Sequence, residues 1–442
     1  MKASALKYTV LTWISGFTIL IFVLVPFHAF ITVWGSTLVG HYAALRLWKE
    51  ALLCLCVIGV LYLLATDRKI RSHTLSRRLV WLILGYIALN IIWGVLALNQ
   101  HDVTAKALGY GLIVNLRFLI FFLVTWAVTL RMKRLRSNWI KFILWPAIIV
   151  VIFGITQELL LTPRFLEHFG YSKYTILPVQ LVDNQPSLNR IQSTLRGANP
   201  LGAYLVVVIS IAIGLLFKER ITQRKRYLWI FIVASLIALF FTYSRSAWVG
   251  MLISAGTLVF IGAKAEVRKQ SFAIGAAGLL ILGVLAVGFW QNSNVQNALL
   301  HTSENAKPHV TSNEARSSAL KSGLSDLADH PLGDGTGTAG PASVYNNKPP
   351  RIAENYFVQI GQELGWLGLG IFVLINVGVG YLLWLRRADP LALSLFAALI
   401  GITFINLLSH AWTDDTLAYI WWGLAGIAMV ADQRIKTDEE HK

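Results

Sequence analysis

The stretch FFTYSRSAWVG, residues 240–250, places an arginine between two apolar runs, and this arrangement decides how the chain crosses a membrane. Apart from Arg245 itself, the nearest basic residues are Arg226 and Lys264, with 37 residues between them. A single helix of that length would be about 56 Å long, whereas the hydrocarbon core of a bilayer is about 30 Å thick. The segment therefore predicts two membrane helices joined by a turn at Tyr243–Ser246, with Arg245 at the tip of the hairpin.

The composition of the whole chain is that of an integral membrane protein. Of its 442 residues, 56% are hydrophobic and 14% are charged, and the mean hydropathy is +0.60, which leaves too little polar surface to cover a soluble core. We predict an all-α membrane fold of about twelve spans in one polytopic domain, 1–442, with the first apolar run retained as a span rather than cleaved as a signal peptide. The predicted spans lie near 8–27, 50–66, 79–98, 107–130, 140–160, 199–217, 227–243, 247–263, 271–290, 356–385, 390–409 and 416–431.

Positive charge is distributed unevenly between the two faces of this predicted bundle. With both termini in the cytoplasm, the inner segments hold 25 of the 39 Lys and Arg residues and 8 of the 22 Asp and Glu residues. These segments carry the full net charge of +17, as the positive-inside rule requires. The basic pI of about 9.9 is thereby explained by membrane orientation, with the lipid bilayer as the partner and no nucleic acid.

Two long segments, 161–198 and 291–355, are expected to be loops on the outer face. Within the second, residues 313–328 predict an amphipathic surface helix, with Leu324 and Leu327 on its apolar face.

Gly335, Gly337 and Gly340 follow this helix in a GxGxxG spacing. A dinucleotide site needs a strand before this motif, and none precedes it. We expect instead a tight loop whose backbone amides are open to a ligand.

Four arginines on the predicted outer face are candidates for binding an anion: Arg190, Arg196, Arg245 and Arg316. Arg245 is flanked by two serines, and a guanidinium held in a tight turn can form a bidentate clamp; the alternative is an arginine that reaches lipid headgroups. Arg190 and Arg196 precede a helix N-terminus near Asn199, where backbone N–H groups also favour an anion. Arg316 lies in the first turn of the amphipathic helix.

Carboxylates on the same face have more ordinary explanations beside the functional one. Glu354 and Asn355 open a span, where they form either a helix cap or, for the carboxylate, a general base. Asp414 and Asp415 are expected in a solvated turn, and no spacing of histidines or carboxylates indicates a metal site.

Arg117 lies within a predicted span, where an ionisable side chain is a functional candidate. We expect it to pair with Glu158 or with a lipid phosphate.

Four segments resemble, in this order, motifs of the O-antigen ligase and O-antigen polymerase superfamily of bacterial envelope enzymes. They are TLRGANPLGAYL (194–205), TYSRSAWVG (242–250), ADHPLGDGTGTAG (328–340) and ENYFVQIGQELGWLGL (354–369), and the resemblance covers about residues 190–430. It implies a GT-C-type glycosyltransferase on the outer face of the bacterial cytoplasmic membrane. Such an enzyme has about a dozen helices and a large outer loop that contains short amphipathic helices.

The resemblance also implies the chemistry. The donor is a glycan on undecaprenyl pyrophosphate, and the acceptor is another glycan or a glycolipid: lipid A core for a ligase, a second lipid-linked repeat for a polymerase, or a wall glycan. Arg196 and Arg245 match arginines that hold the pyrophosphate, and Arg190 and Arg316 are further candidates for that role. Transfer inverts the anomeric carbon and needs neither a metal nor a cofactor.

One position departs from the superfamily pattern. Many ligases have a histidine where Glu354 precedes Asn355, so the expected base is the Glu354 carboxylate or a nearby histidine, His330 or His410. The departure leaves a polymerase open beside a ligase. Two hypotheses from other classes remain: a flippase or transporter of lipid-linked oligosaccharide, which predicts ionisable groups buried at mid-membrane, and a non-catalytic scaffold, which leaves the arginines unexplained.

Overall fold

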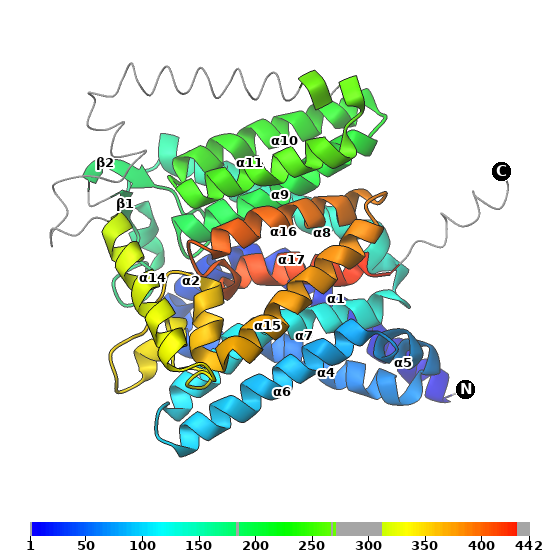
Figure 1. The fold of residues 1–442 in the computed structure, drawn as a ribbon. Coiled ribbons are helices and arrows are strands. Elements are labelled where there is room, and N and C mark those ends of the chain that lie inside the picture. The colour runs from blue at the N-terminus through cyan, green and yellow to red at the C-terminus, as the bar shows by residue number, and fades with distance from the viewer. Residues whose placement is uncertain (1, 183–184, 267, 271–311, 431–442) are drawn as a thin grey trace.

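The computed structural model describes residues 2–182, 185–266, 268–270 and 312–430, and it shows a bundle of long helices (Figure 1). In the described part of the chain the only sheet is the antiparallel pair β1–β2. The predicted all-α class is therefore confirmed.

The elements follow one another with short connections. The first part contains α1 (Lys2–Leu24), the 3₁₀ helix η1 (Val25–Phe27), α2 (His28–Val39), α3 (Tyr42–Leu45), α4 (Trp48–Thr66), α5 (Arg68–Leu75), α6 (Arg78–Asn99), α7 (Ala105–Thr129) and α8 (Lys133–Leu159). The middle part contains η2 (Phe165–Phe169), β1 (Gln180–Val182), β2 (Gln185–Arg190), α9 (Ala198–Lys218), α10 (Thr222–Phe241) and α11 (Arg245–Gly262). The last part contains α14 (Ser312–Asp329), η3 (Gly340–Tyr345), α15 (Tyr356–Leu385), α16 (Pro390–Asn406), η4 (Ala411–Thr413) and α17 (Asp415–Ala428).

Eight segments of the described chain are long and apolar enough to cross a membrane, which makes this a multi-pass membrane protein. They are Ala5–Val39, Trp48–Thr66, Arg78–Asn99, Ala105–Thr129, Arg134–Leu159, Ala198–Lys218, Arg245–Gly262 and Tyr356–Leu385. Three other predicted spans are present as the helices α10, α16 and α17, of which α16 has 17 residues and α17 has 14. The predicted span at 271–290 lies outside the described residues, so the total of twelve stays a prediction.

The predicted hairpin around Arg245 is confirmed. Residues 242–244 join α10 to α11, and Tyr243 takes a positive φ of 48° in this turn. The ring of Phe240 stacks on that of Trp248 with centroids 5.6 Å apart, and the indole N–H donates to the Leu239 carbonyl at 2.9 Å. These contacts fix the turn that presents Arg245.

The bundle has two distinct ends. At one end Figure 1 shows the N-terminus, α5 and the finish of α17, and we call it the basic end because the predicted inner arginines and lysines, such as those of 68–78, lie there. The opposite end holds β1, β2, η3 and the α10–α11 turn, and we call it the loop end. The basic end is the predicted cytoplasmic side.

The predicted amphipathic helix is α14, which packs on α15 at the loop end. Leu327 is buried against Gly361, which has no Cβ to displace it, whereas Leu324 is exposed.

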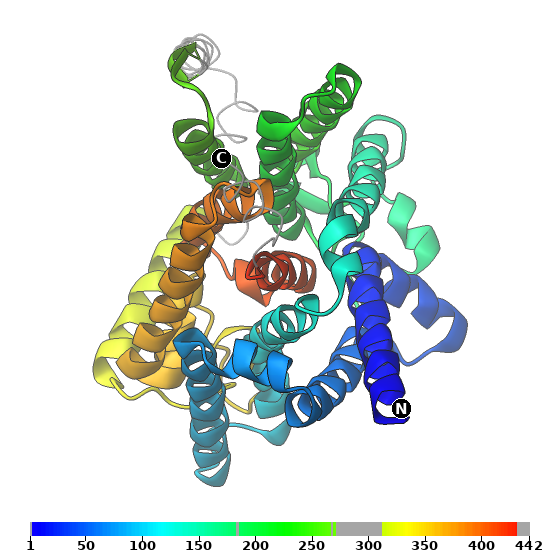
Figure 2. The same cartoon turned by 90° about the vertical axis from the view of Figure 1, so that its right-hand side faces the viewer.

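Helix α17 lies at the centre of the bundle, ringed by the other helices (Figure 2). Its residues from Thr416 to Ala428 are all buried, and Trp422 contacts Phe118 of α7 with ring centroids 5.2 Å apart. The 14 residues of α17 extend only about 21 Å, against a hydrocarbon core of about 30 Å. Arg386 anchors the end of α17 at the basic end by donating to the Met429 carbonyl at 3.0 Å. If the end of α17 lies at the inner edge of such a core, the start of α17 is about 9 Å below the opposite edge.

Helix α15 is broken at Gly365, where φ is +64°, and the loop of residues 331–335 fills the break. The bonds across it run from the Trp366 N–H to the Pro331 carbonyl at 3.0 Å, from the Asp334 N–H to the Gln362 carbonyl at 2.9 Å, and from the Gly335 N–H to the Glu363 carbonyl at 2.8 Å. These bonds replace helix bonds that the break removes, which a backbone shielded from water requires.

The glycine motif forms the predicted tight loop, but its amides are not open to a ligand. Gly335, Gly337 and Gly340 all have positive φ, between 62° and 102°. The Gly337 N–H donates to the fully buried Glu363 carboxylate at 2.8 Å, and the Gly340 N–H donates to the Arg351 carbonyl at 2.8 Å. The expectation of free amides is wrong because α15 and the loop use them to hold each other.

Candidate active site

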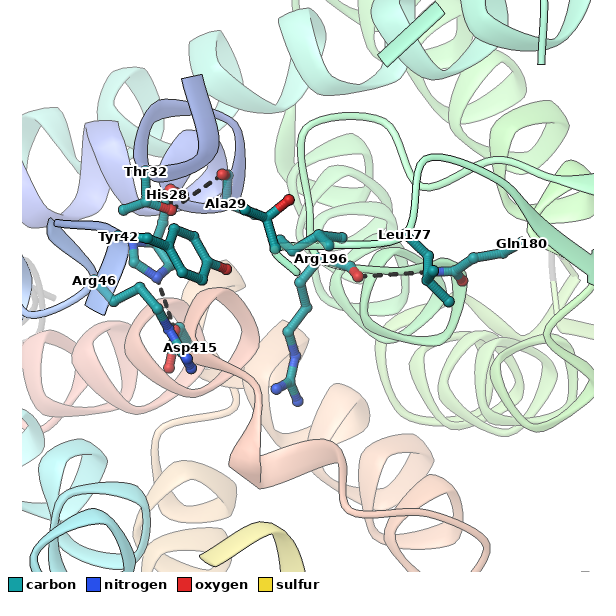
Figure 3. Close-up of a pocket in the computed structure, with 11 residues that line it drawn as sticks. His28, Ala29, Thr32, Tyr42, Arg46, Leu177, Gln180, Arg196 and Asp415 are labelled. Atoms are coloured by element: carbon teal, nitrogen blue, oxygen red, sulfur yellow. Dashed lines mark hydrogen bonds and ion pairs between the residues drawn. The ribbon is translucent and has the colours of Figure 1, made fainter. Parts of the chain in front are cut away.

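A cavity of about 290 Å³ opens near the start of α17, towards the loop end (Figure 3). Its walls come from distant parts of the chain: α2, α3, the connections before α4 and α9, β1 and the start of α17. The polar residues that line it are His28, Thr32, Tyr42, Arg46, Thr175, Gln180, Arg196 and Asp415. Two guanidinium groups, those of Arg46 and Arg196, thus face one cavity.

Arg196 is held at the cavity by the turn that precedes α9. The Gln180 carboxamide accepts from the Ala198 N–H at 3.0 Å and donates to the Arg196 carbonyl at 3.5 Å. The Arg196 guanidinium donates from Nε to Asp414 Oδ2 at 3.0 Å and from Nη2 to Thr413 Oγ1 at 3.5 Å. Its side chain stays 40% exposed, so other N–H groups of the guanidinium remain available for an anion.

Arg46 lies in the connection between α3 and α4, a position that sequence reasoning did not single out. Its guanidinium lies 5.7 Å from the ring centre of Tyr42 and 5.9 Å from that of Tyr110, and it donates to the Tyr110 hydroxyl at 3.4 Å. The signal that could have found it is its place between the first two predicted spans, on the same outer face as the four candidate arginines.

A buried charge cluster, made by His28, Lys49, Glu50, Arg117 and Asp415, adjoins the cavity, whose lining includes His28 and Asp415. The Asp415 carboxylate pairs with Arg117, with Lys49 at 3.3 Å and with His28 at 3.0 Å. Arg117 also reaches Glu50 at 3.3 Å, and Lys49 reaches Glu50 at 3.1 Å. Each cation of the cluster therefore has a carboxylate partner.

This cluster overturns two expectations. Arg117 pairs with Glu50 and Asp415 rather than with Glu158, because α4 and the start of α17 lie beside the middle of α7. Asp414 and Asp415 do not form a solvated turn: Asp414 caps α17 by accepting from the Leu417 N–H at 3.1 Å, and both aspartates bind arginines.

Two of the predicted arginines lie at a second place on the loop end. Arg190 donates from Nε to the Thr242 carbonyl at 2.9 Å and from Nη2 to Asn199 Oδ1 at 2.5 Å. Arg245 is the first residue of α11, directly after Ser244. The structure thus brings Arg190 to the turn that presents Arg245, and both side chains are half-buried.

Arg316 lies on α14 and is half-buried. Within the described residues no ion pair or hydrogen bond joins it to the cavity or to the other predicted arginines.

The predicted catalytic residues at the start of α15 differ in their surroundings. The Asn355 side chain accepts from the N–H groups of Phe357 and Val358 at 2.9 and 3.1 Å, and it donates to the Leu407 carbonyl at 3.0 Å. Asn355 is therefore a fully engaged helix cap. Glu354 is half-buried, bonds to no other described side chain, and has a positive φ of 52°, a strained backbone of the kind that clusters at functional sites.

The two candidate histidines are separated. His330 is 59% exposed and pairs with Asp334 at 2.8 Å at a second cavity, of about 440 Å³, which Arg351 also lines. His410 lies just before η4, and its buried Nε2 has no partner within the described chain. Burial, and then the charge of Arg196, lower the pKa of His410 to about 4, so its imidazole is neutral near pH 7.

In the parts of the chain that the structure describes, no group of three or more His, Cys, Asp or Glu residues could hold a metal ion.

Comparison with known proteins gives one finding. Residues 230–373 match the family model described as O-antigen ligase, a match that covers about a third of the chain. The matched segment contains Arg245, Arg316, His330 and Glu354, whereas Arg196 lies before it. No curated protein matches the chain.

Proposed function

Because residues 230–373 assign the chain to the O-antigen ligase and polymerase superfamily, we propose that it is a membrane glycosyltransferase of the bacterial cytoplasmic membrane. The proposed donor is a glycan on undecaprenyl pyrophosphate, and the proposed acceptor is a second glycan or a glycolipid on the outer face. The loop end is the proposed outer side, with both termini in the cytoplasm. The observation that carries this proposal is the concentration of arginines at that end, with Arg196 facing a recessed cavity.

In the proposed reaction, an acceptor hydroxyl attacks the anomeric carbon of the donor from the face opposite the pyrophosphate. The new C–O bond forms as the bond from the anomeric carbon to the phosphate oxygen breaks, which inverts the configuration. The electron pair leaves with undecaprenyl pyrophosphate, which gains negative charge. Fixed guanidinium groups stabilise that charge, so Arg196 and Arg245 are the proposed pyrophosphate-binding residues, with Arg190 and Arg316 as further candidates. Arginines supply this charge without a metal.

The proposed base for the acceptor proton is the Glu354 carboxylate. It is half-buried, strained in its backbone and free of a described side-chain partner, so it can turn towards a hydroxyl. His330 is the second candidate, although its Nδ1 is paired with Asp334. A pKa of about 4 makes His410 a weak base, and Asn355 supports Glu354 by capping α15.

A second function, transport of a lipid-linked oligosaccharide, is favoured by the buried charge cluster. Ionisable groups buried inside a membrane bundle often mark a transport path. In this chain, however, Arg117 is anchored to the backbone as well, since it donates to the Thr413 carbonyl at 2.7 Å. We therefore rank transport below transfer.

The test is transfer by the purified protein in lipid nanodiscs, with an undecaprenyl-pyrophosphate glycan, a glycan or glycolipid acceptor, and a chelator of divalent metals. Wild type is compared with Arg245→Ala and Glu354→Gln. The matched control is Arg164→Ala, an arginine of the same end whose side chain is 80% exposed and whose described ion pair is with Glu167 alone.

We expect the control to transfer at the wild-type rate. Arg245→Ala should lose at least about a hundredfold, as expected when a group that stabilises a developing oxyanion is removed, and Glu354→Gln should lose rate without losing donor binding. Full activity of Arg245→Ala would reduce that arginine to a headgroup anchor. Transport is measured separately, in proteoliposomes, because a nanodisc has no enclosed compartment. Movement of the donor across the proteoliposome bilayer, without any transfer product, would instead favour transport.

A further inference from the structure

The charges around the 290 Å³ cavity do not cancel. The charged groups that line it or lie in contact with those that do are the cations Arg46, Lys49, Arg117 and Arg196 and the carboxylates of Glu50, Asp414 and Asp415. Four positive charges against three negative ones leave a net charge of +1. A recessed site with an unbalanced positive charge favours an anion.

The histidine of the cluster does not change this count in its observed geometry. The Trp48 indole N–H donates to His28 Nδ1 at 3.0 Å, so that nitrogen carries a lone pair rather than a proton. His28 Nε2 lies 3.0 Å from Asp415 Oδ2 and 3.2 Å from Lys49 Nζ; with Nδ1 unprotonated, the single ring proton is on Nε2 and is donated to Asp415. His28 is therefore neutral, because a second proton would break its bond with Trp48.

The unbalanced cation is Arg46. Each of the three carboxylates already binds other partners: Asp414 binds Arg196, while Asp415 and Glu50 bind Arg117 and Lys49. Among the described residues Arg46 forms no direct ion pair: its guanidinium contacts the two tyrosines, and the Asp415 carboxylate acts on it only at longer range. Their rings hold its guanidinium plane but carry no neutralising charge.

We infer that Arg46 is a further phosphate-binding residue of this protein, and that one phosphate group of a pyrophosphate binds in the cavity between Arg46 and Arg196. The inference rests on the proposed function and deepens it, by adding a residue from the N-terminal part of the chain to the donor site. A guanidinium presents paired N–H groups that match phosphate oxygens, and it keeps its charge at any working pH.

The cavity offers a third donor for such a group. The Tyr42 hydroxyl bonds to no other described residue, and Figure 3 shows it directed towards the side of the cavity where Arg196 lies. A cavity of about 290 Å³ is large compared with the roughly 30 Å³ that one water molecule occupies in the liquid, so an anion with several oxygens fits. Eight of the eleven residues that line the cavity are polar or charged, which agrees with a headgroup rather than a lipid chain as the occupant.

The experiment measures binding apart from catalysis. Purified protein in nanodiscs of uncharged lipid is titrated with inorganic pyrophosphate and, separately, with undecaprenyl pyrophosphate, by calorimetry at low and high salt. The variants are Arg46→Ala, Arg46→Lys and Tyr110→Phe, with Arg164→Ala as the matched control. Tyr110→Phe keeps the ring and removes the hydroxyl, so it tests the site even if Arg46→Ala does not fold.

We expect wild type and Arg164→Ala to bind both probes equally well. Arg46→Ala should weaken both by about tenfold or more, the loss expected for a hydrogen-bonded charge, and Arg46→Lys and Tyr110→Phe by less. Wild-type affinity in Arg46→Ala for both probes would overturn the inference. If only undecaprenyl pyrophosphate binds, the site takes the phosphates as part of a lipid headgroup. If inorganic pyrophosphate binds as well, the phosphates suffice without the lipid tail. In both cases the site is supported only if binding depends on Arg46.

Failure of this inference and failure of the proposed function give different results. If the protein binds pyrophosphate through Arg46 but transfers no glycan, the phosphate site is supported and the proposed transferase activity is contradicted. If the Arg46→Ala variant transfers glycan with the wild-type rate and KM, the transferase activity is supported and the phosphate site at Arg46 is contradicted.

Discussion

The break in α15 should make Gly365 one of the least replaceable glycines of the chain. Its φ of +64° with a ψ of −167° is a conformation that essentially only glycine adopts, at a cost to other residues of about 1–3 kcal/mol. A Cβ at this position would also meet backbone atoms, among them the Pro331 carbonyl oxygen and, at 2.5 Å, the Leu332 carbonyl carbon. Overpacking of this kind costs about another 1–3 kcal/mol. We therefore expect Gly365→Ala to lower the free energy of unfolding by about 2–6 kcal/mol.

The assay is denaturant unfolding of the purified protein, followed by tryptophan fluorescence. The control is Gly370→Ala, the same substitution five residues further along α15, where φ is helical and a Cβ would meet nothing within 4 Å. That variant should be as stable as wild type or more stable by up to about 1 kcal/mol. Equal stability of the two variants would refute the reasoning, because it would mean that the loop of residues 331–335 does not hold the break in place.

Three further predictions concern His410, Asp415 and Asn355. His410 has a pKa of about 4 in the folded protein against an ordinary value of 6.5, so between these pH values only the unfolded chain binds the proton. The free energy of unfolding should therefore fall by up to about 3 kcal/mol as the pH drops from 6.5 to 4. In thermal unfolding, His410→Gln should make stability depend less on pH over this range. Asp415→Asn removes the carboxylate from Arg117 and Lys49, and unfolding should become easier by about 3–5 kcal/mol; a loss below 1 kcal/mol would contradict a buried pair. Asn355→Ala should cost about 1 kcal/mol through the lost cap and Asn355→Ser much less, whereas a stable but inactive serine variant would point to direct catalysis.

Features that depend on local patterns could be predicted from the sequence. Apolar runs of span length gave most of the helices, and the distance between Arg226 and Lys264 required the α10–α11 hairpin because one helix of that length does not fit a bilayer. The glycine spacing predicted a tight loop, since positive φ favours that residue.

Features that depend on which helices are neighbours could not be predicted in this way. Arg117 and the Thr413 carbonyl are 296 residues apart in the chain, and Arg196 and Asp414 are 218 apart, so no local pattern connects them. Asp415 looked solvated because two adjacent aspartates usually form a turn, but the short α17 draws it into the bundle. The expectation of free amides in the glycine loop was wrong for the same reason. The loop amides bond to α15 near its break at Gly365, and that break does not interrupt the hydrophobic run in the sequence.

The shortness of α17 makes the thickness of the bilayer a variable of the reaction. If the proposed donor binds near Asp415 and α17 ends at the inner edge of a roughly 30 Å hydrocarbon core, the donor headgroup descends about 9 Å below the outer edge and takes the first isoprene units of its chain with it. Lipids with shorter acyl chains bring the interface down towards the cavity, and lipids with longer chains raise it, at a fraction of a kcal/mol for each ångström of mismatch. The apparent KM for the lipid-linked donor should therefore rise with acyl-chain length in reconstituted bilayers, while an acceptor that approaches from the water should be bound equally well in all of them.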